Sequence, residues 1–346
     1  MSVLQQLLGI DVPLIQAPMA GVQDSALAIA VSNAGALGSL PCAMLDNAAM
    51  RRELAAIRSQ TRRPFNINFF CHTAPQVDAA REAKWRASLD GYYAEFGIDT
   101  SKIPAGPGRS PFSAQALDVL REFRPPVVSF HFGLPAPELL APLRSWNAKI
   151  VSSATTVEEA LWLEARGIDA IIAQGLEAGG HRGNFLTSDL TVQMGTLALV
   201  PQIVRKIKVP VIAAGGIADR AGIAAVMNLG AAGVQMGTAF LLCPEARTSA
   251  LHRAALKSDA SRHTALTNLF SGGAARGIVN RLMRERGPMS DTAPEFPLAG
   301  AAVAPLRTAA ESRGSGEFSP LWSGQNPTGC KEMPAADLVR ELIVAS

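Results

Sequence analysis

The sequence predicts an α/β fold, a TIM (β/α)8 barrel with a cap over its mouth. Short apolar segments recur eight times, and amphipathic stretches alternate with them along the chain. Such alternation implies a parallel sheet, and eight units suggest that the sheet closes into a barrel. The polar, glycine and histidine residues also gather where the apolar segments end. An open doubly wound sheet remains the alternative, because the pattern alone does not show closure.

The first four apolar segments have the length of buried strands and are bounded by turn residues. They cover residues 13–18, 36–41, 65–70 and 127–133. Capping residues predict helices from Asp24 and from Asp46. A further helix is expected near Pro135, since proline suits the first turn of a helix.

The next four segments follow the same pattern. They cover residues 149–154, 170–174, 209–214 and 233–241. Thr156 followed by two acidic residues predicts a helix after the fifth segment. A helix over residues 219–229 follows the seventh segment, and a last barrel helix is expected from Glu245.

Two stretches are too long to be simple connections between strand and helix. One follows the third strand, and the other follows the eighth unit and is rich in Gly, Pro and Ala. Long excursions in a compact domain are usually lids or binding loops, so we expect the two to pack together as a cap and substrate region. The predicted division is a barrel of residues 1–72 and 127–270, with 324–346 packing back on it, and a cap of residues 73–126 and 271–323.

Composition describes a well-buried globular protein. Of the 346 residues, 48% are hydrophobic and 18% are charged, and the net charge is only +3. No basic run favours nucleic acid as a partner, and no run reaches the roughly 18 apolar residues of a membrane span. The four cysteines show no CxxC spacing, so we expect reduced, mostly buried thiols in a cytoplasmic chain without a secretion signal.

Paired small residues on the seventh and eighth units predict a phosphate site. Gly215 and Gly216 follow the seventh strand, and Gly237 and Thr238 lie in the eighth segment. Barrels often bind phosphate with the loops after these two strands, where backbone N–H groups attract an anion. No GxGxxG follows the first strand, which argues against a Rossmann dinucleotide site.

The segment 169–183 contains the strongest catalytic candidate. A buried strand ends at Gln174 and opens into a glycine-rich loop with His181 at its centre. Glycines allow the backbone to approach a ligand closely, and a near-neutral imidazole there could accept a proton from carbon. An exposed and inert histidine is the alternative interpretation.

The other polar groups at strand ends allow two interpretations each. His131 ends the fourth strand and is either a site residue or a packed core residue. Asn68 and Gln174 carry amides that suit the edge of a heterocycle or satisfy local backbone. His252 and His263 are expected on the surface. The carboxylates are scattered, and no metal site is predicted.

The ordered set of motifs resembles the bacterial nitronate monooxygenases of the FMN-dependent class I, formerly called 2-nitropropane dioxygenases. The matching segments share the order and spacing of that family along most of the chain. They are Gln16-Ala17-Pro18-Met19, residues 66–70, residues 129–135, residues 173–183, Ala213-Ala214-Gly215-Gly216-Ile217 and residues 233–241.

This resemblance implies one non-covalently bound FMN and the oxidation of alkyl nitronates, such as propionate 3-nitronate, with O2. The products would be a carbonyl compound and nitrite or nitrate, as in detoxification. His181 would be the catalytic base and His131 would line the substrate pocket. The positions expected to contact the cofactor are Met19, Asn68, Gln174, Gly179, Gly180, Gly215, Gly216, Gln235, Met236, Gly237 and Thr238.

Three other functions stay open at the level of sequence. One is an NAD(P)H-dependent flavin reductase of related barrel fold, acting on enoyl thioesters or quinones, although no nicotinamide site is recognisable. The others are a flavin-binding protein without turnover and a phosphosugar isomerase-like barrel without flavin. The cap departs from the family in having Gly273 where arginine is common and no tyrosine after it.

Overall fold

Eight parallel strands form the centre of the molecule. The structure, a computed structural model, describes residues 2–103 and 109–343. The strands pair in the order β1-β9-β8-β6-β5-β4-β3-β2. Their bounds are β1 Leu14–Gln16, β2 Gly38–Pro41, β3 Phe65–Phe70, β4 Val127–His131, β5 Lys149–Ala154, β6 Ala170–Gln174, β8 Val211–Ala214 and β9 Gly233–Met236.

The two ends of this sheet meet, so the predicted TIM barrel is confirmed and the open doubly wound alternative is wrong. A parallel bridge joins Ile15 of β1 to Leu37, the residue before β2. The backbone N–H of Gln16 donates to the Leu37 carbonyl at 2.9 Å, and the backbone N–H of Leu37 donates to the Leu14 carbonyl at 2.9 Å. Closure of this kind places the inward side chains of all strands in one packed core.

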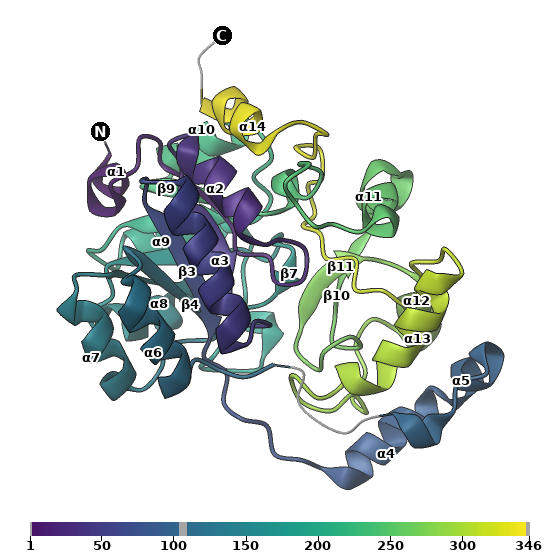
Figure 1. Cartoon of the computed structure of the whole chain (residues 1–346). Helices are drawn as coiled ribbons and strands as arrows, with labels where there is room; N and C mark the ends of the chain where they lie inside the picture. The colour runs from purple at the N-terminus through teal and green to yellow at the C-terminus, as the bar shows by residue number, and fades with distance from the viewer. Residues whose placement is uncertain (1, 104–108, 344–346) are drawn as a thin grey trace.

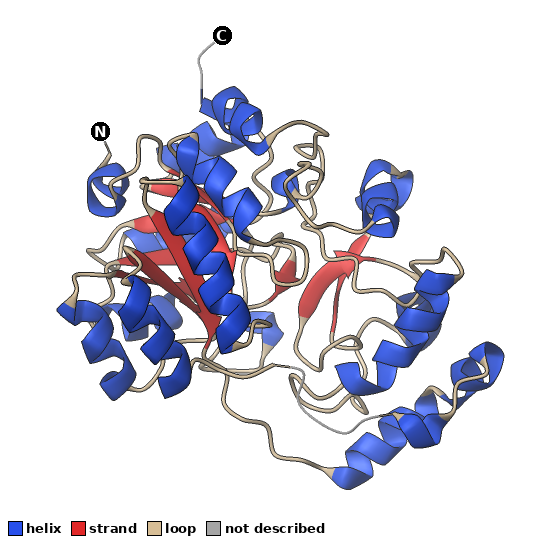
Figure 2. Cartoon of the chain, viewed as in Figure 1, coloured by secondary structure: helices blue, strands red, loops and turns tan. Residues whose placement is uncertain are grey.

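Helices surround the barrel, as Figures 1 and 2 show. The predicted caps are present: the side chains of Asp24, Asp46, Thr156 and Asp219 each accept an amide of the first helical turn. The barrel helices are α2 Ser25–Asn33, α3 Asn47–Gln60, α6 Ala114–Phe123, α7 Pro137–Ser145, α8 Val157–Glu164, α9 Thr196–Val204 and α10 Arg220–Asn228. Helix α1 (Val3–Leu8) contributes Leu4 and Leu8 to a core cluster with residues of the barrel strands.

The helix expected after the eighth strand differs from the prediction. It runs as α11 (Ala250–Lys257) and packs against the 3-10 turn η4 (Asp259–Arg262), away from the other barrel helices. The place beside α2 is taken by the C-terminal helix α14 (Ala335–Ile343), whose apolar residues are buried there. Glu245 accepts the Ala335 amide at 3.1 Å, so the predicted starting residue caps a different helix.

The two long excursions pack against each other, but residues 114–123 of the first, which the predicted division placed in the cap, form the helix α6 and pack in the barrel core. After β3, helices α4 (Ala79–Ser88) and α5 (Asp90–Phe96) extend outward. They share an apolar cluster with the segment after the eighth unit. The elements of that segment are β10 Thr264–Thr267, β11 Ala275–Ile278, α12 Arg281–Arg286 and α13 Gly300–Ser312.

Hydrogen bonds and ion pairs join the two parts of the cap. Trp85 donates its indole N–H to the Ala299 carbonyl at 3.1 Å. Tyr93 donates its hydroxyl to the Ala302 carbonyl at 2.7 Å. Because these partners lie more than 200 positions apart, the cap forms only after distant parts of the chain meet.

The cap also has a small sheet of its own. Strand β11 pairs antiparallel with β10 on one side and with β7 (Gly180–His181) on the other. The loop after β6 is therefore a strand of the cap sheet. Within residues 2–103 and 109–343, no helix is long and apolar enough to cross a membrane, and the four cysteines are free.

Candidate functional site

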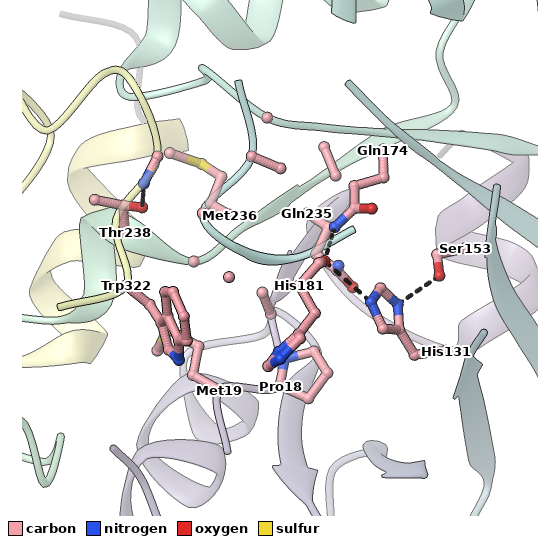
Figure 3. A pocket seen from close by; sticks show the side chains of 18 of the residues that line it. Pro18, Met19, His131, Ser153, Gln174, His181, Gln235, Met236, Thr238 and Trp322 are labelled. Carbon is pink, nitrogen blue, oxygen red and sulfur yellow. Dashed lines mark hydrogen bonds between the residues drawn. The ribbon is translucent and has the colours of Figure 1, made fainter. Parts of the chain in front are cut away.

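One cavity of about 180 Å³ lies at the carboxyl ends of the barrel strands, under the cap. Every residue that the sequence singled out for substrate, cofactor or catalysis lines it. They are Met19, Asn68, His131, Gln174, Gly179, Gly180, His181, Gly215, Gly216, Gln235, Met236, Gly237 and Thr238. Figure 3 shows many of these side chains around the cavity.

The backbone of His181 is held by two barrel side chains. The Gln174 amide donates to the His181 carbonyl at 2.9 Å, and His131 Nε2 lies 3.1 Å from the same oxygen (Figure 3). Gln174 also accepts the Gly183 amide at 2.8 Å. Both polar atoms of the Gln174 side chain thus bind the loop, which fixes the base of the His181 side chain.

These contacts determine the protonation of His131. A carbonyl only accepts, so Nε2 carries the proton and Nδ1 accepts the Ser153 hydroxyl at 2.6 Å. Burial lowers the pKa of His131 to about 4, so the ring is neutral near pH 7. His131 lines the cavity and also supports the loop, which combines the two interpretations that the sequence left open.

The His181 ring lines the cavity and directs Nε2 toward two polar side chains. Its Nε2 lies 2.8 Å from the Ser271 hydroxyl and 3.4 Å from Nη1 of Arg109. Because a guanidinium only donates, Nε2 is the accepting nitrogen. Burial, followed by the charges of Arg109, His131 and His72, lowers the pKa of His181 well below its usual range. The His181 ring is therefore neutral near pH 7.

Aromatic rings from both the barrel and the cap surround His181. The ring centroids of Phe296 and Trp322 lie 5.1 and 5.5 Å away, and those of Phe70 and Phe132 lie 6.2 and 6.3 Å away. All four meet the imidazole at steep angles of 61–68°. Apolar rings around an imidazole lower the local dielectric and strengthen electrostatic interactions there.

Glycines line part of the cavity and form a cradle there. Gly215 and Gly216 have φ angles of +114° and +72°, which glycine adopts without strain. A Cβ at Gly179 would come within 2.5 Å of the Gly324 amide nitrogen, so the backbones there approach closely. Gln235 Oε1 is buried in this wall without a hydrogen-bond partner among the described residues. Such an unsatisfied acceptor is expected where a ligand supplies the donor.

A C-terminal segment, residues 322–330, crosses this cradle as a strap. Gly324 donates its amide to the Thr238 hydroxyl at 2.9 Å (Figure 3), and Asn326 donates to the Gly216 carbonyl at 3.1 Å. The strap therefore bonds to both of the loops predicted to hold phosphate. It ties the seventh and eighth units together across the cavity.

Several cavity residues were not identified from the sequence. They are Arg109, Ser153, His252, Trp322 and Asn326. They lie in cap segments, in a strand interior or in the strap, where nothing in the local pattern distinguishes them. Trp322 was the one usable signal, because a large aromatic side chain in a C-terminal segment is usually buried against something.

The surface position expected for His252 is wrong. The side chain is only 3% exposed, and its Nε2 lies 3.0 Å from the Trp322 carbonyl. Burial lowers its pKa to about 4. The error has a physical cause, because α11 packs within the cap side of the molecule rather than in the outer ring of barrel helices. His263 is exposed, as predicted.

Arg182 shapes the loop around His181. Its guanidinium is 1% exposed and donates to the carbonyls of Gln174 and Gly175, both at 2.6 Å, and to Gln193 at 2.7 Å. A buried arginine that donates to several acceptors holds the segments that carry them in a fixed arrangement. No group of metal-ligating side chains occurs among residues 2–103 and 109–343.

The family model for nitronate monooxygenase matches residues 1–345 of this chain. A nitronate monooxygenase from Pseudomonas aeruginosa is 44% identical over 345 residues, which cover 98% of this chain and 97% of the relative. The chain belongs to the nitronate monooxygenase family. This confirms the resemblance found in the sequence.

Solved structures agree with membership of the nitronate monooxygenase family. A nitroalkane oxidase from Streptomyces ansochromogenes superposes with a TM-score of 0.88 at 38% identity, covering 99% of this chain and 96% of that one. FabK from Thermotoga maritima superposes less closely, with a TM-score of 0.71 at 25% identity over 99% and 95% of the two chains. The barrel and the cap are thus both shared with a protein named for nitroalkane oxidation.

Proposed function

We propose that this protein oxidises alkyl nitronates, such as propionate 3-nitronate, with O2 and a bound FMN. The products are a carbonyl compound and nitrite or nitrate. The observation that carries this proposal is a neutral histidine, His181, facing a glycine-lined cavity at the barrel mouth. Membership of the nitronate monooxygenase family and the likeness to a nitroalkane oxidase support it.

The residues of the cavity fit FMN in two respects. The close backbone approach at Gly179 and the turn through Gly215 and Gly216 leave room for a phosphate and its N–H donors. The unsatisfied Gln235 Oε1 suits an N–H of a flavin ring. The residues that would hold FMN are Met19, Asn68, Gln174, Gly179, Gly180, Gly215, Gly216, Gln235, Met236, Gly237 and Thr238.

The chemistry divides between the cofactor and this chain. FMN, when bound, supplies the acceptor for substrate electrons and their route to O2. The chain holds the substrate beside the rings of Phe70 and Trp322, which line the cavity. It holds His181 in place through Gln174 and His131.

His181 Nε2 accepts the α-proton of a neutral nitroalkane, which converts it to the nitronate. A preformed nitronate has already lost that proton and does not need the base. Turnover of a preformed nitronate therefore reports binding and electron transfer, whereas turnover of a neutral nitroalkane also reports proton removal.

We further infer that the enzyme works in the cytoplasm, where it removes toxic nitronates. All four thiols are free, as is usual in a reducing compartment. Burial raises the pKa of Cys330 to about 12, so this thiol of the strap stays protonated.

The visible spectrum of the purified protein tests the proposal. A flavin spectrum is expected, followed by bleaching when a nitronate is added without oxygen and recovery when air is admitted. NADH added without oxygen should leave the flavin oxidised. Rapid bleaching by NADH with no response to nitronate would support the flavin reductase instead. A colourless protein that takes up no FMN would exclude both.

A further inference from the structure

Arg109 reaches the cavity from the cap segment after β3. Its guanidinium carbon lies 5.6 Å from the ring centroid of Phe296 and 6.0 Å from that of Phe70. Nη1 lies 3.4 Å from Nε2 of His181, the atom proposed to accept the substrate proton. The cation is thus placed beside the proposed base, in the wall of the same cavity.

In the part of the chain that the structure describes, no acidic side chain is paired with Arg109. Within residues 2–103 and 109–343, no carboxylate lies within 4.0 Å of its guanidinium, and no Asp or Glu lines the cavity. Burial lowers the pKa of Arg109, yet a guanidinium keeps its proton in proteins. A cation taken out of water without a counter-ion is costly, and an anionic ligand removes that cost when it binds.

We propose that Arg109 binds the two oxygens of the nitronate group and orients the α-carbon toward His181. This inference rests on the proposed function and names the residue that recognises its anionic substrate. A planar fork of N–H donors matches a planar pair of anionic oxygens, as it does in a carboxylate. The nitro nitrogen is bonded directly to the α-carbon, so donors for its oxygens belong next to the base.

Arg109 also assists proton removal from a neutral nitroalkane. The α C–H bond breaks, its proton passes to His181 Nε2, and its electron pair moves onto the nitro oxygens. No electron leaves the substrate in this step. The negative charge develops at the oxygens that Arg109 contacts, so the contact is stronger in the transition state than in the neutral substrate.

Substitution of Arg109, with nitrate as a probe, tests this assignment. Nitrate is a planar monoanion with the same O–N–O arrangement as a nitronate. In the holoenzyme, R109Q should raise the nitrate Kd and the KM for a preformed nitronate about 10- to 100-fold, the range of a charge-assisted hydrogen bond. R109K keeps the positive charge without the planar set of N–H donors, so its nitrate Kd and nitronate KM should lie between those of R109Q and the unchanged protein.

Arg313 is a matched control. Its guanidinium also lies over an aromatic ring of the cap, 4.5 Å from the centroid of Phe96, but it does not line the cavity. R313Q should leave the nitrate Kd and the nitronate KM unchanged.

Two results would overturn the assignment. One is a nitrate Kd and a nitronate KM in R109Q equal to those of the unchanged protein. The other is loss of FMN from both R109Q and R109K with an unaltered nitronate KM in the remaining holoenzyme, which would place Arg109 on the cofactor. If the unchanged holoenzyme does not oxidise nitronates, the proposed function fails, while the nitrate Kd still reports whether Arg109 binds a planar anion.

Discussion

At the scale of single residues, His181 is positioned through its main chain. Its carbonyl receives hydrogen bonds from Gln174 and His131, while its ring is left to face Ser271, Arg109 and the cavity. Because Gln174 and His131 bind the main chain, the ring makes its own contacts. Its Nε2 faces Arg109 and Ser271, which a substrate would have to displace from the lone pair. The same arrangement keeps the imidazole orientation fixed, as a general base requires.

Removal of the base should affect the two substrate forms differently. We expect H181N to lower kcat/KM for a neutral nitroalkane about 10²- to 10⁴-fold, the usual contribution of a general base. Turnover of a preformed nitronate should change by less than about tenfold, because no α-proton remains to be removed. Steady-state kinetics with both forms measures the ratio. Equal losses on both substrates would contradict the role of His181 as a base.

The pH dependence of the same reaction reports the charge beside the base. A protonated His181 accepts no proton, so a lowered pKa keeps kcat/KM for neutral nitroalkanes constant down to pH values well below 6.5. Arg109 is one cause of that lowering, together with burial and the neighbouring His131 and His72. In R109Q the acidic limb should therefore move to higher pH. An unmoved limb would show that the charge of Arg109 does not act on His181.

At the scale of elements, the cradle depends on two loops and a strap that nearly touch. A Cβ at Gly179 would meet backbone atoms of Ser323 and Gly324 at 2.5–3.1 Å, and a backbone cannot rotate away as a side chain can. The loop and the strap must then separate. Retention of FMN is the property that this separation should alter.

We expect G179A to raise the Kd for FMN about tenfold or more, since overpacking typically costs about 1–3 kcal/mol. Flavin fluorescence on dilution measures the release. Gly91 in α5 provides a matched control, because a Cβ there meets nothing within 4 Å. G91A should bind FMN as the unchanged protein does. Equal FMN affinity in G179A would mean that the strap does not enclose the cofactor.

The sequence predicted most helices and strands of the barrel, and it identified the loop residues at the strand ends that line the cavity. Glycines at strand ends and side chains that cap helices act locally. Gly215, Gly216 and the helix N-cap Asp219 could therefore be recognised from their neighbours alone. The eighth barrel helix could not, because α11 and α14 are both short amphipathic helices and only tertiary packing selects between them. Arg109 and His252 were missed for the same reason. Their place in the cavity depends on how the cap folds back.

At the scale of the whole molecule, burial of neutral histidines links stability to pH. His131 and His252 both have a pKa of about 4 in the folded protein, below the 6.5 of a free histidine. Between these pH values the unfolded chain binds more protons than the folded one. Stability is therefore fully present above pH 6.5 and is lost as the pH falls toward 4.

The free energy of unfolding should accordingly decrease from pH 7 to pH 4.5, by up to about 3 kcal/mol for each histidine. Denaturant unfolding at several pH values measures the slope. H252Q removes one titrating group and keeps an N–H for the Trp322 carbonyl, so its slope should be shallower. Identical slopes for H252Q and the unchanged protein would exclude a contribution from His252.

Pairing of β7 with β11 also has a consequence for how enzymes of this shape can diverge. His181 lies opposite Ala275 in a sheet of the cap, although its carbonyl is held by the barrel. A cap taken from a relative would bring its own β11. Because β11 pairs with the strand that carries His181, the position of the His181 ring would change. Exchange of substrate preference between such enzymes should therefore succeed with the outer helices α4, α5, α12 and α13, provided that residues 264–278 of the recipient are retained.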